Sequence, residues 1–446
     1  MTTPVHDPVE GTAAPRRPLR ALVAGSVGNL IEWYEFGVYG YFATIIAANF
    51  FTPDGGSDVE ALVKTYASFA LAFFFRPVGA AVFGRLGDRM GRRPTLIVVI
   101  LLMTGATTLI GLLPTYATLG AAAPWLLTLL RVVQGLSAGG EFGGAVSIMT
   151  EFAPPGRRGL YGAWQSFTVA LGLLAGAGMA ALLATVLTGP ELDDWGWRLP
   201  FLLTLPLGLA ALWLRLKLEE TPSFRRTRTG PPEKEGRPPA VTPPPAPARE
   251  VAKAIVLGAG RLMGWSAAGY TFLVVMPSYL QSTLNASFQQ ALVATVLANL
   301  GFAASILPAG ALSDRIGRRA VMVTGAVLVA VLAFPLMHLL QDAGSSTASK
   351  SVAVFVAGAA VGLMAGPGPA MLSEMFPTSV RYTGLGLAYA LSNAVFSGCA
   401  GLIITEAIKR TGNIDIPAHY VVVTCAVSTL ALLTLRGDDH RRALRD

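Results

Sequence analysis

The sequence predicts an all-α, polytopic membrane protein whose twelve transmembrane helices form two six-helix repeats. Three observations predict this fold. Apolar residues make up 53% of the 446 residues and charged residues only 13%, whereas a soluble domain carries roughly 25% charge. The apolar residues gather in twelve long runs, and two charged motifs recur between the halves. This composition excludes a secreted disulfide scaffold, a disordered protein and an ordinary soluble enzyme.

Each apolar run is expected to be a helix, because lipid offers no hydrogen-bond partners to an open backbone. One span needs about 20 mostly apolar residues. The first run is longer than the roughly 7–15 residues of a signal-peptide core, so we expect it to be a retained span. In chain order the predicted spans cover residues 20–48, 59–84, 94–113, 122–150, 159–187, 197–217, 252–281, 289–312, 319–340, 351–373, 381–407 and 417–436.

A long Pro-rich and charged stretch separates the first six spans from the last six. It contains Pro231-Pro232 and Pro243-Pro244-Pro245, and such composition favours extended or disordered chain. The expected organisation is a tail, a six-helix bundle, a linker, a second six-helix bundle and a tail, over residues 1–19, 20–217, 218–251, 252–436 and 437–446.

Basic residues concentrate on one side of the predicted membrane. With the N-terminus in the cytoplasm, the tails, the even-numbered loops and the linker hold 26 of the 34 Lys and Arg residues, and the opposite side holds five. Cytoplasmic loops are enriched in Lys and Arg, so both termini are expected in the cytoplasm. The net charge of +8 is then a topology signal, and no nucleic-acid partner is expected.

The sequence gives no indication of a cofactor. Cys399 and Cys425 lie in apolar runs, and no Cys/His cluster has the spacing of a metal site, so no metal is expected. No Walker loop is present either, so direct drive by ATP is not expected. Gly135 to Gly139 match a Gly-x-Ser-x-Gly elbow, but that motif needs a strand–turn–helix context. In mid-span these glycines favour close helix contact instead.

Two charged motifs recur at nearly constant spacing. The segment 84–93 (GRLGDRMGRR) returns 226 positions later as 310–319 (GALSDRIGRR). Glu151, Pro154 and Arg158 return 223 positions later as Glu374, Pro377 and Arg381. Two independent motifs at similar offsets indicate an internal duplication. Parallel six-helix repeats are typical of secondary transporters whose site lies near the midplane between the repeats.

The repeated loop resembles the signature of the major facilitator superfamily. Segments 28–36, 134–141, 194–201 and 374–382 are similar to its metabolite–proton symporter branch, which takes up small carboxylates and zwitterions such as proline, betaines, 2-oxoglutarate, citrate and shikimate. Segments 219–224, 276–280 and 417–420 resemble the proline/betaine-transporting members most. Two departures stand out: Glu35 replaces the usual Asp, and the chain ends about ten residues after the last span, without the long coiled coil of those members.

Ionisable groups within spans are the candidate transport residues, because each costs roughly 2.5–3.5 kcal/mol at membrane depth. Span 1 carries Glu32 and Glu35, and span 4 carries Arg131, Gln134 and Glu141 within one helical stripe. The resemblance to sugar–proton symporters places Glu35 and Arg131 where an acid faces an Arg. We hypothesise that protonation of Glu35 frees Arg131 to bind a substrate carboxylate. The alternative is a static ion pair, Glu32–Arg131 or Glu141–Arg76.

The second half offers Arg261, Tyr389 and Asn393. Arg261 could meet an anionic substrate group or extend to the cytoplasmic interface, and Tyr389 and Asn393 share a helix face. The resemblance also implies charge networks that latch the cytoplasmic side, with simple topogenic charge as the alternative. The candidate gating residues are Asp88, Arg89, Arg92, Arg93, Glu151, Arg158, Asp314, Arg315, Arg318, Arg319, Glu374 and Arg381.

The expected function is proton-coupled import of a small carboxylate or zwitterion by alternating access, in the bacterial cytoplasmic membrane and as a monomer. No enzymatic activity is expected. Two alternatives remain open: a proton-antiporting exporter of a metabolite or drug on the same fold, and a transporter-like sensor that moves nothing.

Overall fold

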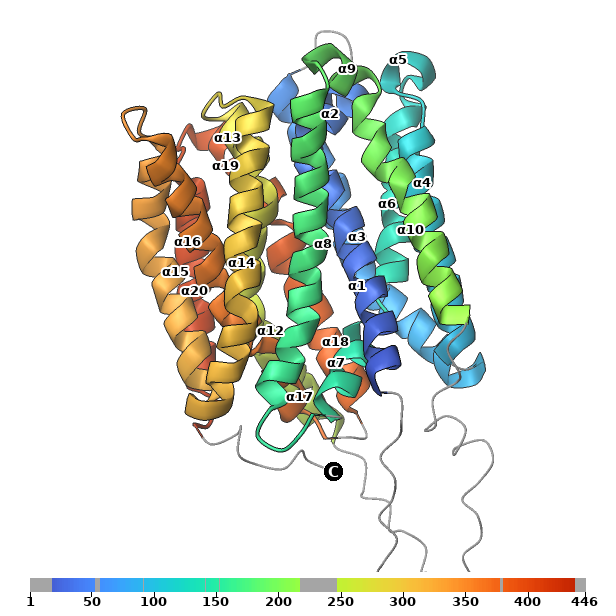
Figure 1. The fold of residues 1–446 in the computed structure, drawn as a ribbon, viewed down its shortest axis with the longest axis vertical. Coiled ribbons are helices and arrows are strands. Elements are labelled where there is room, and N and C mark those ends of the chain that lie inside the picture. Colours follow the sequence, from blue (N-terminus) through green and yellow to red (C-terminus); the bar gives the residue numbers. More distant parts are fainter. Residues whose placement is uncertain are drawn as a thin grey trace, which may run out of the picture.

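The computed structural model describes residues 18–52, 57–90, 92–140, 142–151, 153–216, 247–377 and 380–437. Every regular element in these ranges is a helix. The long helices run side by side along the long axis of the molecule, with short helices at both ends (Figure 1). The all-α fold that the sequence predicts is therefore confirmed.

The first half contains six helical units. Each coincides with one predicted span, although some spans are built from two consecutive helices. The long helices are α1 (Pro18–Tyr41), α3 (Asp58–Met90), α4 (Arg92–Leu112), α6 (Ala122–Ala138) followed by α7 (Phe142–Glu151), α8 (Arg158–Val186) and α10 (Leu199–Leu216). The short elements are α2 (Ala43–Ile46), η1 (Ala47–Phe51), α5 (Tyr116–Leu119), α9 (Gly189–Asp194) and η2 (Gly196–Arg198).

The second half repeats this plan. Two of its spans are interrupted by π-helical turns, which often mark functional positions in helices. Its elements are α12 (Ala248–Tyr270), η3 (Thr271–Val275), α13 (Met276–Ser282), α14 (Phe288–Ile316), α15 (Arg318–Gln341), α16 (Thr347–Ala365), α17 (Gly368–Met375), α18 (Arg381–Ser392), η4 (Asn393–Gly398), α19 (Ala400–Thr411) and α20 (Ile416–Leu433).

The outer surface of the bundle is apolar. Trp125 is 77% exposed, Leu430 67% and Val331 64%, which is the surface that a lipid environment requires. Eight helices in the described ranges are long and apolar enough to cross a membrane, and two further apolar helices are shorter. The protein is therefore a multi-pass membrane protein.

The internal duplication is visible in how helices pack. A Cβ atom added to Gly135 would lie 1.8 Å from the carbonyl oxygen of Ala72, where α6 crosses α3. A Cβ atom added to Gly358 would lie 1.9 Å from the carbonyl oxygen of Ala298, where α16 crosses α14. Gly358 lies 223 positions after Gly135, and Ala298 lies 226 positions after Ala72, so both contacts follow the offsets of the repeated motifs. The repeat therefore preserves the same close helix crossing, and the helix-contact role predicted for these glycines is confirmed.

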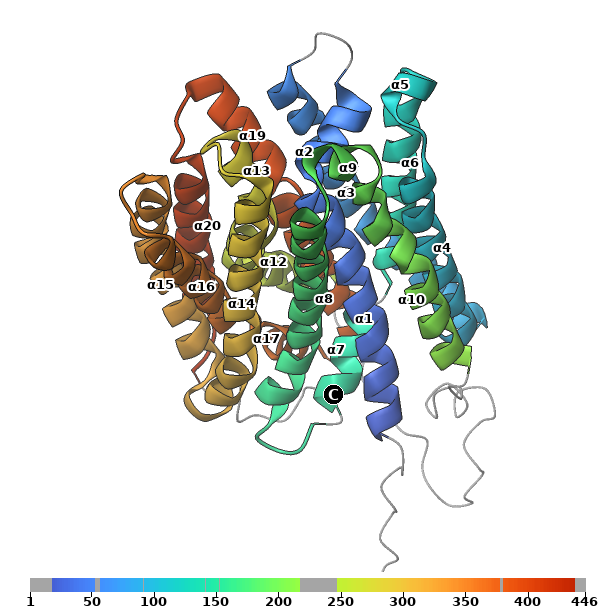
Figure 2. The same cartoon turned by 45° about the horizontal axis from the view of Figure 1, so that its top comes forward.

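Helices from the two halves meet along the middle of the molecule. In both views α8 of the first half lies beside α14 of the second (Figures 1 and 2), and α3 packs against η4 and α19. We call the end that carries α7, α17 and the start of α8 the lower end, as drawn in Figure 1, and the opposite end the upper end. Some of the candidate residues, among them Asp314 and Arg158, belong to helices that meet at this junction.

Candidate transport site

An ion pair joins α1 and α3 near the middle of the first half. Arg76 Nη2 lies 3.4 Å from Glu32 Oε1. Arg76 is 3% exposed and Glu32 7%, so both charges are removed from solvent. The structure therefore pairs Glu32 with Arg76, whereas the static alternatives from the sequence paired Glu32 with Arg131 and Arg76 with Glu141.

Arg131 of α6 is fully buried. Its Nη1 donates to Gln134 Oε1 at 2.7 Å, and Gln134 Nε2 donates to Thr107 Oγ1 at 2.6 Å. Arg131 Nε and Nη2 find no hydrogen-bond acceptor among the described residues. Gln134 thus fixes one edge of the guanidinium, and the other edge keeps donors for a further acceptor.

Glu35 is also fully buried and acts electrostatically on Arg131. Together with Glu32 it lines a small cavity inside the first bundle, between α1, α4, α6 and α10. Glu35 and Arg131, the acid and the arginine that the sequence paired, are thus both buried in the first bundle, and their coupling stays a prediction. Glu141 lies outside the described residues, so its predicted place on the same stripe stays a prediction.

Aromatic rings surround both guanidinium groups. The Cζ atom of Arg76 lies 4.2 Å from the ring centroid of Phe36 and 4.3 Å from that of Phe73. The Cζ atom of Arg131 lies 4.1 Å from the ring centroid of Tyr39. Rings at these distances stabilise a buried cation through their negative faces. Sequence reasoning missed Phe36 of α1 and Phe73 of α3, although the four-residue spacing of Phe69 and Phe73 on α3 was a usable signal.

The second half contributes aromatic groups to the same region. Tyr389 of α18 stacks on Phe142 of α7, with ring centroids 3.5 Å apart. Tyr270 of α12 packs against Phe73 at 5.4 Å. Tyr389 therefore contacts a helix of the first half, and its role in transport stays a prediction. Asn393 does not present a free amide there, because its Nδ2 donates to the Tyr389 carbonyl and its Oδ1 accepts from Ser397.

Arg261 lies away from this cluster, at the lower end of the second bundle. Its Nη2 donates to Thr434 Oγ1 at 2.8 Å and its Nε to the Ala431 carbonyl at 3.3 Å. It lines a cavity of about 270 Å³ that Lys253 and Arg436 also border. Of the two roles considered for Arg261, this position favours extension toward the end of the span.

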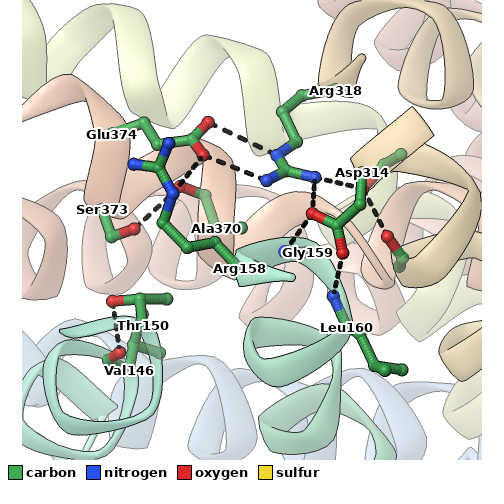
Figure 3. Close-up of polar contacts among 12 residues, drawn as sticks. Val146, Thr150, Arg158, Gly159, Leu160, Asp314, Arg318, Ala370, Ser373 and Glu374 are labelled. Atoms are coloured by element: carbon green, nitrogen blue, oxygen red, sulfur yellow. Dashed lines mark hydrogen bonds and ion pairs between the residues drawn. The ribbon is translucent and has the colours of Figure 1, made fainter. Parts of the chain in front are cut away.

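A charge network joins the two halves at the lower end (Figure 3). Asp314 of α14 accepts hydrogen bonds from the backbone N–H groups of Gly159 at 2.7 Å and Leu160 at 2.9 Å. These are among the first amides of α8, whose N–H groups have no helical partner. A carboxylate there also complements the positive end of the helix. Asp314 thus caps a helix of the opposite half.

Arg318 organises the rest of this network. Its Nη1 donates to Asp314 Oδ1 at 2.8 Å and its Nη2 to Glu374 Oε1 at 3.1 Å. Arg158 of the first half contacts the same Glu374 at 3.6 Å between Nε and Oε1. Two acids of the second half therefore hold the start of α8, and the lower end is closed.

The remaining candidate gating residues divide into three groups. Arg381 is 2% exposed and donates to the carbonyls of Ser373 and Phe376, so it orders the turn before α18. Arg315 is exposed, and Arg319 donates to the Leu435 carbonyl at 3.4 Å. The described parts of the structure do not include the side chains of Asp88, Arg89, Arg92, Arg93 and Glu151.

The upper end is closed by contacts that the sequence did not predict. Tyr66 of α3 and Ser278 of α13 share a hydrogen bond of 2.6 Å, and Thr44 Oγ1 donates to Gln281 at 3.1 Å. These bonds join the first half to the second. Contacts among the described residues therefore join the two halves at both the upper and the lower end.

The chain resembles transporter families over both halves. Residues 21–233 match the family described as Sugar (and other) transporter, and residues 263–445 match the Major Facilitator Superfamily. The chain belongs to the major facilitator superfamily, whose members are membrane transporters and not enzymes.

Several curated relatives are named as transporters of proline together with betaine or ectoine. The Proline/betaine transporter of Escherichia coli (strain K12) is 34% identical over 428 residues, which cover 95% of this chain and 84% of that protein. The Ectoine/proline transporter ProP of Corynebacterium glutamicum is 34% identical over 439 residues, which cover 96% of this chain and 86% of that protein.

Solved structures show the same fold. A crystal structure of a D-xylose-proton symporter superposes with a TM-score of 0.71 at 20% identity, covering 93% of this chain and 96% of that chain. The inward open conformation of the xylose transporter XylE from E. coli gives a TM-score of 0.69 at 18% identity, covering 94% and 95%. The predicted two-half transporter architecture is therefore confirmed.

Proposed function

We propose that this protein is a proton-coupled symporter that imports a small zwitterion, such as proline or a betaine, across the bacterial cytoplasmic membrane. The observation that carries the proposal is the fully buried Arg131 with two N–H donors open to a further acceptor, beside the buried acid Glu35. The names of the relatives support the substrate class.

Coupling follows from the electrostatics of this pair. An ionised Glu35 lowers the attraction of Arg131 for a second carboxylate. A proton on Glu35 removes that competing charge, so the guanidinium then binds the carboxylate of the substrate. Because a buried, uncompensated charge is costly, only the carrier loaded with both proton and substrate, or with neither, reorients. One proton moving with a zwitterion gains about 2.3 kcal/mol per 100 mV of membrane potential.

Alternating access then requires the two ends to open in turn. The excess of basic residues supports a cytoplasmic location for the lower end and for both termini. The network of Asp314, Arg318 and Glu374 closes that end, and its release admits substrate to the cytoplasm. We propose that one chain forms the complete transport unit.

The test is transport in proteoliposomes with imposed gradients. We expect radiolabelled proline or glycine betaine to accumulate when the outside is acidic, whereas accumulation driven by outward proton movement would indicate an exporter. Glu35→Gln should retain counterflow, because the substrate site remains, but lose proton-driven accumulation. Glu60→Gln is the control, because it makes the same change at an exposed glutamate that pairs with Lys64 on the surface of α3. Proton-driven accumulation by Glu35→Gln at the wild-type level would show that Glu35 is not the coupling acid.

A further inference from the structure

Five buried aromatic rings from three helices form one cluster at the junction of the halves. Phe36 of α1 contacts Phe73 of α3 at 5.2 Å between ring centroids, and Phe73 contacts Tyr270 of α12 at 5.4 Å. Tyr270 closes back onto Trp33 of α1 at 6.3 Å. Phe69 extends the cluster at 5.2 Å from Phe73. We call Trp33, Phe36 and Phe73, with Tyr270 behind them, the aromatic cage.

The guanidinium of Arg76 occupies this cage. Its Cζ atom lies 4.2 Å, 4.3 Å and 5.3 Å from the ring centroids of Phe36, Phe73 and Trp33. Its Nε and Nη2 find no hydrogen-bond acceptor in the described ranges, and its contact with Glu32 measures 3.4 Å. A buried arginine is ordinarily held by hydrogen bonds to a carboxylate. Here three ring faces supply much of the stabilisation.

Such a cage suits a cation that has no hydrogen to donate. A quaternary ammonium spreads its charge over methyl groups, so it needs ring faces and gains nothing from acceptors. Arg76, by contrast, carries N–H groups on Nε and Nη2 that find no hydrogen-bond acceptor in the cage. The cage is thus better matched to a quaternary ammonium than to the side chain that now fills it.

We propose that the aromatic cage is the ammonium subsite for a betaine-type substrate, and that Arg76 occupies it in the closed conformation and leaves when substrate enters. The inference rests on the zwitterion proposed above. Phe36 connects the two charged groups, because its ring lies 4.2 Å from Arg76 Cζ and 5.0 Å from Arg131 Cζ. A zwitterion with its ammonium in the cage therefore directs its carboxylate toward the open donors of Arg131. The displaced Arg76 guanidinium then leaves the rings and moves closer to the Glu32 carboxylate, which it already contacts at 3.4 Å.

If a substrate ammonium replaces Arg76 in the cage, substrates with different ammonium groups should depend on the rings to different extents. Glycine betaine has no N–H and depends on the ring faces. Proline has a secondary ammonium with two N–H donors, so hydrogen bonds can replace part of the ring contact. A substitution that removes one ring face therefore weakens the binding of betaine more than the binding of proline.

The experiment measures KM for glycine betaine and for proline in proteoliposomes containing the full chain. Phe73→Leu should raise KM for betaine about tenfold and KM for proline less than about threefold, whereas Phe73→Tyr should restore betaine transport. Phe201→Leu is the matched control, because Phe201 is also fully buried but packs against Trp197 outside the cage. Equal shifts for both substrates, or no shift, would overturn the cage.

A second measurement separates charge from packing. Fluorinated phenylalanines at position 73 keep the shape of the ring and weaken its negative face stepwise, so the KM for betaine should rise with each fluorine. The isostere 3,3-dimethylbutanoate keeps the carboxylate but has an uncharged tert-butyl group in place of the ammonium. It should compete poorly with betaine in the wild type, and Phe73→Leu should weaken its binding less than the binding of betaine. If the KM for betaine does not change with fluorination, the proposed ammonium subsite is wrong, although the proposed transport of zwitterions would still stand. Absence of uptake of both substrates would overturn the proposed function as well.

Discussion

Asp314→Asn is the most direct test of how the lower end closes. The Asp314 carboxylate accepts two backbone hydrogen bonds from the start of α8, at 2.7 and 2.9 Å, and one from Arg318 at 2.8 Å. Asn keeps one acceptor oxygen, but it loses the negative charge and the second acceptor. We therefore expect the lower end to open more often, without loss of the fold.

The size of the effect follows from these contacts. Removing a helix-capping side chain costs about 0.5–2 kcal/mol, and a hydrogen bond that involves a charged group contributes about 1.5–3 kcal/mol. Because Asn retains part of the cap, we expect the closed lower end to lose about 2 kcal/mol. That loss shifts the equilibrium between closed and open forms about 30-fold.

Distances between spin labels on the two halves report this equilibrium. Pro155 and Ile316 are exposed and lie near the start of α8 and the end of α14, so cysteines there carry labels, with Cys399 and Cys425 replaced. Asp314→Asn should increase the population at long distance in the absence of substrate.

Asp342→Asn is the matched control. Asp342 also accepts a backbone N–H bond, from Gly344 at 2.9 Å, but within its own half. That bond, with one from Ser345, lowers the pKa of its exposed carboxyl. An unchanged distance distribution in Asp314→Asn, or the same change in Asp342→Asn, would show that Asp314 does not hold the lower end closed.

Two further predictions concern the upper end and the helix crossings. Tyr66→Phe removes the hydrogen bond to Ser278 and should weaken upper-end closure by about 1 kcal/mol. The measurement is faster labelling of a cysteine at Leu280, which is buried two residues further along α13. Tyr420→Phe, which loses a bond within one half, should not change this rate. Gly135→Ala places a Cβ atom 1.8 Å from the Ala72 carbonyl oxygen and should lower the melting temperature by several degrees, since overpacking costs about 1–3 kcal/mol. A Cβ atom added at Gly178 meets nothing within 4 Å, so Gly178→Ala is the control. An equal fall in its melting temperature would contradict the role of the close contact between α6 and α3 at Gly135.

Much of the fold could be predicted from the sequence because the signals for it are local. Each apolar run must form a helix in lipid, so the predicted spans coincide with the observed helical units, including 122–150 as α6 and α7. What the pattern did not reveal is that spans are broken by π turns at Thr271–Val275 and Asn393–Gly398. Such breaks depend on packing against neighbouring helices and leave no periodic signal.

The candidate site was predictable only in part. Buried charges in an apolar span stand out in any sequence, so Glu32, Glu35 and Arg131 were found. The partner of Glu32 was not, because an ion pair between helices depends on the rotation of each helix about its axis. That rotation places Arg76 against Glu32 and keeps Arg261 at the lower end.

The sequence by itself determined twelve spans, a duplicated architecture and a short set of intramembrane charges, because hydrophobic length and repeated motifs are properties of the chain alone. Only the tertiary structure decided what these groups contact. Asp314 binds backbone amides of the opposite half, which carry no side-chain signature. The aromatic cage around Arg76 gathers rings from α1, α3 and α12, and these helices become neighbours only when the two halves pack together.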